Sequence, residues 1–169
     1  MNSEQELKIM KARAAKLAEP IIEHASSQDI EFVRFSLEDG GEYGIAYEFV
    51  EGIIKPDKLA LVPCAPEAVT GVVSWRGSLL AVADISLLFG GGAQIAKQRP
   101  WVVVVQQEGK RLGLLAAVMR SSKIFSASDL KPNLAAEQGQ KSEYIQGTIG
   151  ENIAILKVEA LFSSKKLMF

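Results

Sequence analysis

Apolar and polar side chains alternate along most of this chain, which is the pattern of β-strands with one buried face. The alternation starts at residues 32–37, and a glycine-rich turn leads from there into a second strand at residues 43–47. The remaining strands are expected at residues 49–54, 72–75, 79–83, 101–105, 112–119, 144–149 and 153–157. Short helices are expected at residues 85–89, with Asp84 as the N-cap, and at residues 159–162. The pattern therefore predicts a mainly β protein.

The first residues follow a helical period instead. Apolar side chains recur there every three or four positions, Ser3 and Glu6 match a capping box, and Pro20 should end the helix. We interpret residues 1–24 as an N-terminal amphipathic helix and residues 25–31 as a polar linker. The apolar stripe has two interpretations: the helix folds back on its own domain, or it is offered to a partner.

A weak internal repeat relates the two halves of the β region. The matching glycines are Gly40 with Gly109 and Gly44 with Gly113, at an offset of 69 positions. The later part of each half also matches, at offsets of 73 to 76. Each half has only four or five expected strands, so small closed barrels packed side by side are the simplest solution. We place the barrels at roughly residues 32–92 and 100–162, with a groove between them and a tail at residues 163–169.

Charge and composition exclude several classes of function. The 169 residues carry 19 basic and 20 acidic side chains, a net charge of -1, which gives no electrostatic reason to expect nucleic acid or an anionic membrane as the main partner. The N-terminus lacks the pattern of a signal peptide, and no apolar run approaches membrane-spanning length. We therefore expect a cytoplasmic protein without direct membrane insertion.

The sequence offers little that could perform catalysis. A single cysteine, Cys64, and a single histidine, His24, cannot form an internal disulfide or supply a zinc site by themselves. Neither a nucleophile elbow nor a phosphate-binding loop is present at the required spacing. Cys64 is interpreted as a small buried hydrophobic residue rather than a reactive thiol. We expect no catalytic residue, no metal site and no cofactor.

The turn at Ser74-Trp75-Arg76-Gly77 carries the one strong signal, and it is a signal of interaction. Two apolar strands flank it, and Gly77 can adopt the positive φ that a tight bend requires. Trp75 fits either the core or a recognition surface equally well. Arg76 is expected to be exposed and available for a carboxylate or carbonyl group of a partner.

Six patches in a fixed order resemble the CheW-like family, the coupling proteins of bacterial chemosensory arrays. They are Tyr43-Gly44-Ile45-Ala46, Val50-Glu51-Gly52-Ile53, Val62-Pro63-Cys64-Ala65-Pro66, Gly71-Val72-Val73-Ser74-Trp75-Arg76-Gly77, Leu80-Ala81-Val82-Ala83-Asp84-Ile85 and Leu88-Phe89-Gly90. The resemblance covers residues 32–162. It implies two five-stranded barrels and a non-catalytic adaptor between the regulatory domain of a CheA-type histidine kinase and the cytoplasmic tip of chemoreceptors.

The resemblance also implies roles for particular residues. Arg76 would face the receptor, Gly77 would meet the backbone requirement of the turn, and apolar strand positions of the first barrel would face the kinase. The chain departs from the family pattern at three positions of this surface: Gly52 stands where a glutamate is usual, and Ser74 and Trp75 replace an Asn-Leu pair. These five residues form our predicted partner-binding set. The departures are compatible with a divergent chemosensory system, such as one controlling pilus motility, or with an altered interface.

Two other classes of function are weighed against this one. A small hydrolase or ligand-binding enzyme could use the groove between the barrels, but the sequence supplies no nucleophile and base at a suitable spacing. A nucleic-acid-binding barrel is disfavoured by the slightly acidic charge balance and the scattered aromatic residues.

Overall fold

The computed structural model of the chain describes residues 29–91, 100–132 and 141–167. The predicted N-terminal helix, residues 1–24, lies outside these ranges. The predicted linker is wrong in its last three positions, because residues 29–31 belong to the first strand, where Asp29 pairs with Ser126.

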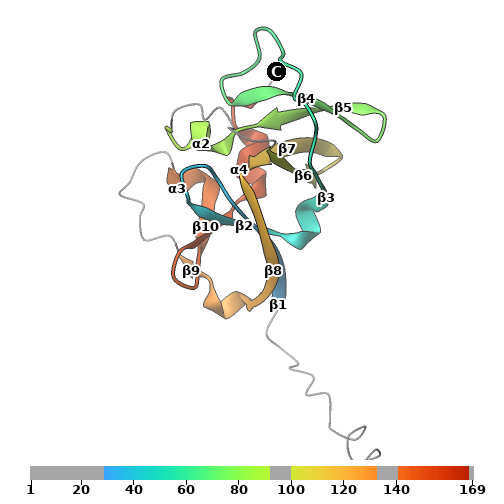
Figure 1. The fold of residues 1–169 in the computed structure, drawn as a ribbon. Coiled ribbons are helices and arrows are strands. Elements are labelled where there is room, and N and C mark those ends of the chain that lie inside the picture. Colours follow the sequence, from blue (N-terminus) through green and yellow to red (C-terminus); the bar gives the residue numbers. More distant parts are fainter. Residues whose placement is uncertain (1–28, 92–99, 133–140, 168–169) are drawn as a thin grey trace, which may run out of the picture.

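A six-stranded sheet forms the lower half of the molecule in Figure 1. Its order is β8 (Val118–Ser126), β1 (Asp29–Ser36), β2 (Glu42–Ala46), β11 (Ile153–Leu156), β10 (Ile145–Ile149) and β9 (Lys131–Pro132). All neighbours are antiparallel except β2 and β11, which are parallel.

A five-stranded sheet forms the upper half. Its order is β3 (Val50–Ile54), β6 (Trp101–Gln107), β7 (Lys110–Ala116), β5 (Ser78–Ala83) and β4 (Val69–Trp75). Again one central pair, β5 and β7, is parallel, and the other pairs are antiparallel.

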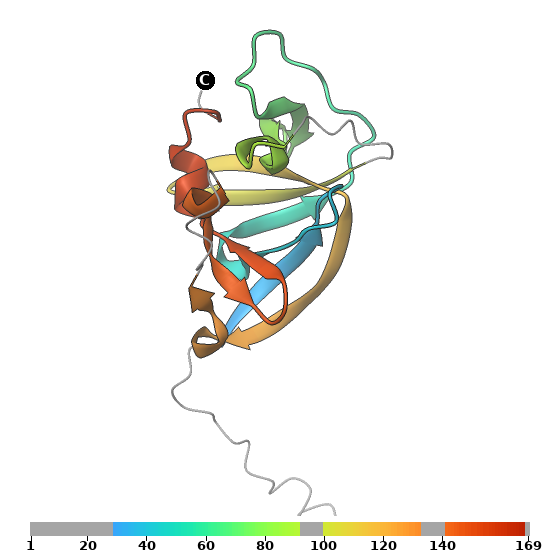
Figure 2. The same ribbon diagram turned by 90° about the vertical axis from the view of Figure 1, so that its left-hand side faces the viewer.

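The chain passes twice between the sheets. It first passes upward through the short 3-10 helix η1 (Tyr47–Phe49), and it returns at Ala117, between β7 and β8. Figure 2 shows β8 as the long curved strand that descends along the side of the lower sheet. Each sheet therefore contains strands from both halves of the sequence, and a division into one barrel at residues 32–92 and another at 100–162 does not describe the sheets.

The internal repeat is visible in the pairing. The hairpin β1–β2 corresponds to β6–β7, and the parallel pair β2–β11 corresponds to β7–β5. The mainly β architecture of two packed units is thus confirmed, but closure is not: among the described strands the pairing ends at β8 and β9 in one sheet and at β3 and β4 in the other.

Short helices occupy equivalent places after the last strand of each half. Helix α2 (Ile85–Leu88) follows β5, and helix α4 (Val158–Ser163) follows β11. As predicted, Asp84 caps α2, since its carboxylate accepts hydrogen bonds from the Ser86 N–H at 2.9 Å and the Ser86 hydroxyl at 2.6 Å. Two further single turns, η2 (Ala127–Asp129) and α3 (Lys141–Tyr144), lie in the second half.

The main core lies between the sheets. Phe35 and Ile45 of the lower sheet, Val103 and Leu114 of the upper sheet, and Leu161 of α4 meet there without exposed surface. Each sheet buries a second cluster on its other face, because successive strand residues point to opposite sides. The upper cluster is Val73, Leu80, Val82, Val102, Val104 and Leu115, and the lower cluster is Phe32, Ile149, Ile153 and Ile155.

Cys64 is not the small buried residue that we expected. It is exposed and has a φ of 56°, in the segment that the prolines keep irregular. Within the described ranges, no helix is both long enough and apolar enough to span a bilayer.

Candidate partner-binding site

The candidate site is built on the hairpin between β4 and β5. Trp75 pairs with Ser78, and the two residues between them, Arg76 and Gly77, have φ values of 48° and 81°. Two successive residues with positive φ make the tight turn whose twist matches that of the flanking strands. Gly77 adopts a positive φ without strain, whereas a residue with a side chain, such as Arg76, rarely does. The turn therefore fixes the direction in which the Arg76 side chain leaves the backbone. The β6–β7 hairpin uses the same geometry at Glu108 and Gly109, with φ values of 49° and 78°.

Glu51 links this turn to two other strands. Its carboxylate, on β3, accepts a hydrogen bond from Arg76 Nη1 at 2.9 Å and another from Arg111 Nε, on β7, at 2.5 Å. The hydrogen bond from Arg111 is the main cause that holds the Glu51 pKa below its ordinary value, and the charges of both arginines act in the same direction. The three side chains together carry one net positive charge. The carboxylate is mostly covered, with 15% of its side chain exposed, whereas 65% of the Arg76 side chain is exposed.

The Trp75 indole packs between the Arg76 guanidinium and Gly52. The Arg76 guanidinium carbon is 4.8 Å from the centre of the ring, which is a cation–π distance. A Cβ atom added to Gly52 would lie only 2.6 Å from the Cη2 atom of the indole. Gly52 therefore makes room for the ring. A glutamate at this position, as the family resemblance would place it, could not be accommodated without displacing the indole.

The acidic side chain of this site comes instead from Glu51, the residue before Gly52. The pairing of β3 with β6 shifts between Val50 and Gly52, so that Glu51 lies in a bulge opposite the Val104–Val105 step. A bulge redirects a strand side chain, and here it accompanies a glutamate that reaches the two arginines. The departures at Gly52 and Trp75 are thus one structural feature: the ring fills the space that the glycine leaves, and the acid comes from Glu51.

A cleft of about 360 Å³ lies beside this cluster. Trp75, Arg76 and Arg111 contribute to its walls together with Leu79, which is 80% exposed on β5. An exposed leucine next to an aromatic ring and two guanidinium groups has the chemistry of a protein-recognition surface. The cleft suits a partner segment that presents an apolar side chain beside a carboxylate or a carbonyl group.

The family model of the CheW-like domain matches residues 31–166. The chain belongs to the CheW-like family. The match begins two residues after the start of β1 and extends past α4, so it includes both sheets and the whole of the candidate site.

Relatives of known name agree with this family membership. The chain is 25% identical over 150 residues to a protein named chemotaxis protein CheW from Treponema pallidum, which covers 84% of the chain and 87% of the relative. It is 25% identical over 108 residues to the chemotaxis protein CheW of Rhizobium meliloti, covering 62% and 70%. The fold is similar to that of the scaffolding protein TtCheW from Thermoanaerobacter tengcongensis, with a TM-score of 0.72 at 21% identity, covering 83% of this chain and 98% of that one.

In this CheW-like domain the structure brings together most of the partner-binding set that the sequence predicted. Arg76 and Trp75 line the cleft, Gly77 completes the turn, and Gly52 lies under the indole. Ser74 is exposed but lies elsewhere: it alternates with Trp75 along β4, so its side chain leaves the opposite face of the sheet and does not line the cleft.

Sequence reasoning missed Glu51, Arg111 and Leu79. The internal repeat contained a signal for Glu51 and Arg111. At an offset of 69 positions, Glu51 matches Arg120, and Arg111 matches Glu42. Arg120 and Glu42 form the corresponding ion pair in the lower sheet, at 3.6 Å, with the charges exchanged. An acid and a base that exchange places at matched positions of a repeat indicate a spatial contact that both halves share. The exposure of Leu79 depends on the end of the hairpin projecting beyond the core, which the strand pattern did not reveal.

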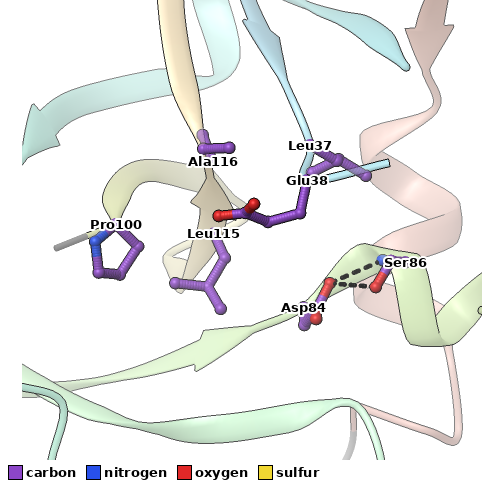
Figure 3. A pocket seen from close by; sticks show the side chains of 8 residues that line it. Leu37, Glu38, Asp84, Ser86, Pro100, Leu115 and Ala116 are labelled. Carbon is purple, nitrogen blue, oxygen red and sulfur yellow. Dashed lines mark hydrogen bonds between the residues drawn. The ribbon is translucent and has the colours of Figure 1, made fainter. Parts of the chain in front are cut away.

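A small cavity lies between residues that follow β1, residues at the start of α2 and the end of β7. It has a volume of about 20 Å³, room for little more than one water molecule. Figure 3 shows Glu38, Leu115 and Ala116 closing it from one side, and Asp84 engaged with Ser86 on the other. Over the described ranges, no three histidine, cysteine, aspartate or glutamate side chains are grouped so as to hold a metal ion. This cavity is too small to hold a substrate, so it gives no support to the hypothesis of an enzyme that uses the groove between the units.

Proposed function

We propose that the chain is a non-catalytic cytoplasmic adaptor that couples chemoreceptors to a histidine kinase in bacterial chemosensory signalling, of the chemotaxis or the pilus-motility type. Membership of the CheW-like family and the names of its chemotaxis relatives support the general role. The observation that carries the proposal on this chain is the cluster of Arg76, Trp75 and Glu51 beside the exposed Leu79.

The cleft is proposed to bind the cytoplasmic tip of the receptor. Arg76 has one nitrogen bound to Glu51 and most of its side chain exposed, so it can donate further hydrogen bonds without losing its support. The guanidinium packs on the indole, and the turn fixes its backbone, so the free side chain already adopts few conformations. It therefore loses little conformational entropy on binding. A preorganised arginine beside an exposed leucine is the arrangement expected of an interaction hot spot.

The kinase regulatory domain is proposed to dock at the edge of the upper sheet. β3 is an edge strand, and two large apolar side chains near it are exposed: Ile53 at 42% and Tyr47, in η1, at 56%. An edge strand with exposed apolar side chains is a surface on which another protein can pack. This surface and the receptor cleft are joined through β3, because Glu51 lies on the same strand two residues before Ile53.

The two surfaces can be tested separately with purified partners. Arg76→Ala should lose most of its affinity for a receptor cytoplasmic fragment and keep its affinity for the kinase regulatory domain, as measured by isothermal titration calorimetry. Ile53→Asp should show the reverse. Arg120→Ala is the matched control, because Arg120 is also about half exposed and paired with a glutamate but belongs to the lower sheet.

Unchanged receptor affinity in Arg76→Ala would remove this arginine from the interface. Failure of the wild-type chain to bind either partner would reject the adaptor function itself.

A further inference from the structure

The lower sheet contains a large cavity that the proposed function does not use. Its volume is about 670 Å³, and its walls come from β1, η1, η2, β10, β11 and the start of α4. Cavities of 300–1,000 Å³ are typical of sites that hold a ligand or a group of side chains. Three residues of the lower cluster, Phe32, Ile149 and Ile155, line it, and the partly buried Ile30, Leu130 and Ile145 extend this apolar lining.

The equivalent region of the upper sheet is covered. Val73 and Val82 correspond in the repeat to Ile149 and Ile155, and the Trp75 ring packs against their cluster. β10 ends at Ile149, so the lower hairpin has no strand residue that corresponds to Trp75. The side chains of Ile30, Ala46, Phe125 and Leu130 pack against the lower cluster instead, and they leave a cavity beside it that has no described counterpart of the Trp75 ring.

The rim of the cavity is acidic. Glu48, Glu143 and Glu159 lie around it and are exposed, and Lys157 is the single basic residue among the described residues that line it. An occupant should therefore combine an apolar stripe with positive charge.

Residues 7–18 of the chain have both properties. Apolar side chains recur there at helical spacing, at Leu7, Met10, Ala14 and Leu17. The segment also contains Lys8, Lys11, Arg13 and Lys16 and no acid, since the neighbouring glutamates lie outside it at positions 4, 6 and 19. The family model starts at residue 31, so this segment is an addition to the shared domain.

The connection to the cavity is short. β1 starts at Asp29, and its second residue, Ile30, already lines the cavity. The ten residues from 19 to 28 can span up to about 33 Å when extended, more than enough to return the segment to the mouth. A tethered segment acts at an effective concentration in the millimolar range, which favours it over a free peptide or a second copy of the chain.

We propose that residues 7–18 dock as an amphipathic helix in this cavity, with the apolar stripe on the lower cluster and the basic side chains toward Glu48, Glu143 and Glu159. The docked segment is an intramolecular cover for the lower sheet. It leaves the receptor cleft of the upper sheet open, so this proposal and the proposed function stand or fall separately.

Paramagnetic relaxation in the full chain tests the contact. A nitroxide label is placed at Ala12→Cys, which lies opposite the apolar stripe on a helical wheel, in a Cys64→Ser background because Cys64 is exposed. Amide signals of Leu130, Ile145 and Ile155 should lose most of their intensity, and those of Trp75 and Arg76 should keep theirs. In a mixture of isotope-labelled chain without nitroxide and unlabelled chain with nitroxide, the cavity signals should be unaffected.

Two further variants make the result specific. Met10→Asp with Leu17→Asp should restore the cavity signals, whereas the conservative pair Met10→Leu with Leu17→Met should leave the broadening in place. Unaffected cavity signals in the labelled chain would overturn the proposal, and so would broadening that persists in the Asp variant. Broadening in the mixed sample would overturn it as well, because the occupant would then be a second copy.

Discussion

The contact between Gly52 and Trp75 makes a quantitative prediction about stability. A methyl group at Gly52 would lie 2.6 Å from Cη2 of the indole, where ordinary contacts begin at 3.4 Å, so one group must move by about 0.8 Å, the difference between these distances. Gly52 is not among the glycines with positive φ, so alanine can adopt its backbone conformation without strain. The cost of Gly52→Ala is therefore steric.

We expect Gly52→Ala to lower the free energy of unfolding by about 1–2 kcal/mol, since overpacking typically costs 1–3 kcal/mol and the gain in strand propensity offsets part of it. In a Trp75→Leu background the ring is gone, and the same change should be neutral or stabilising by up to about 1 kcal/mol. The coupling energy of the double-mutant cycle should therefore be roughly 1–3 kcal/mol, as found for residues in direct contact.

Urea denaturation of the four proteins, followed by circular dichroism, measures this coupling. Gly40→Ala is the matched control. Gly40 has a φ of +81° and no atom within 4 Å of the added Cβ, so its cost of about 1–2 kcal/mol comes from the backbone and should be the same in the wild-type and Trp75→Leu backgrounds. Additive effects of Gly52→Ala and Trp75→Leu would refute the view that these two departures form one contact.

Three further predictions concern single side chains. The lowered pKa of Glu51 means that its carboxylate stabilises the fold above the ordinary carboxylate pKa of 4.5 and that this contribution is lost as the pH falls through the lowered value. Melting temperatures of Glu51→Gln should consequently fall less on acidification than those of the wild type, and parallel profiles would contradict the cluster. Burial raises the pKa of Tyr43 from 10.0 to about 12, so the neutral phenol stabilises the fold up to pH 10 and this contribution disappears as the pH rises toward 12. Tyr43→Phe should retain more of its stability over that range in alkaline urea titrations; an equal loss in both proteins would argue against a buried phenol. Asp84→Ala should cost about 1–2 kcal/mol through the lost cap of α2, and Asp84→Asn, which still accepts a hydrogen bond, should recover part of it in the same denaturation assay.

Local patterns predicted nine of the eleven strands that the structure describes, and they predicted the hairpin turns. Alternation found the strands that bury at least one face, and Gly40, Gly77 and Gly109 marked the hairpins through the positive φ they adopt. It missed β8, whose side chains are mostly exposed, and the two-residue β9. The strand expected at residues 112–119 was wrong at its end, because β7 stops at Ala116 and β8 begins at Val118. Strand partners could not be obtained in this way. The extension of β1 to Asp29 depends on β8, which lies in the other half of the sequence, and the passage of the chain between the sheets is set by such distant pairings.

In the candidate site too, the sequence predicted the local part and missed the residues that come from distant strands. Arg76 and Gly77 were predictable because the turn is local. Glu51 and Arg111 come from strands far from the turn in sequence and meet it only through the order of the upper sheet. The exposed position of Cys64 was also missed, because the flanking prolines, which hold it in an irregular segment, say nothing about which side of that segment faces water.

The adaptor function is tested most directly by sedimentation of the kinase with receptor cytoplasmic fragments displayed on vesicles. We predict that the kinase enters the pellet only when the chain is present, and that Arg76→Ala abolishes this transfer whereas Arg120→Ala supports it. Equal amounts of kinase in the pellet with and without the chain would contradict the account.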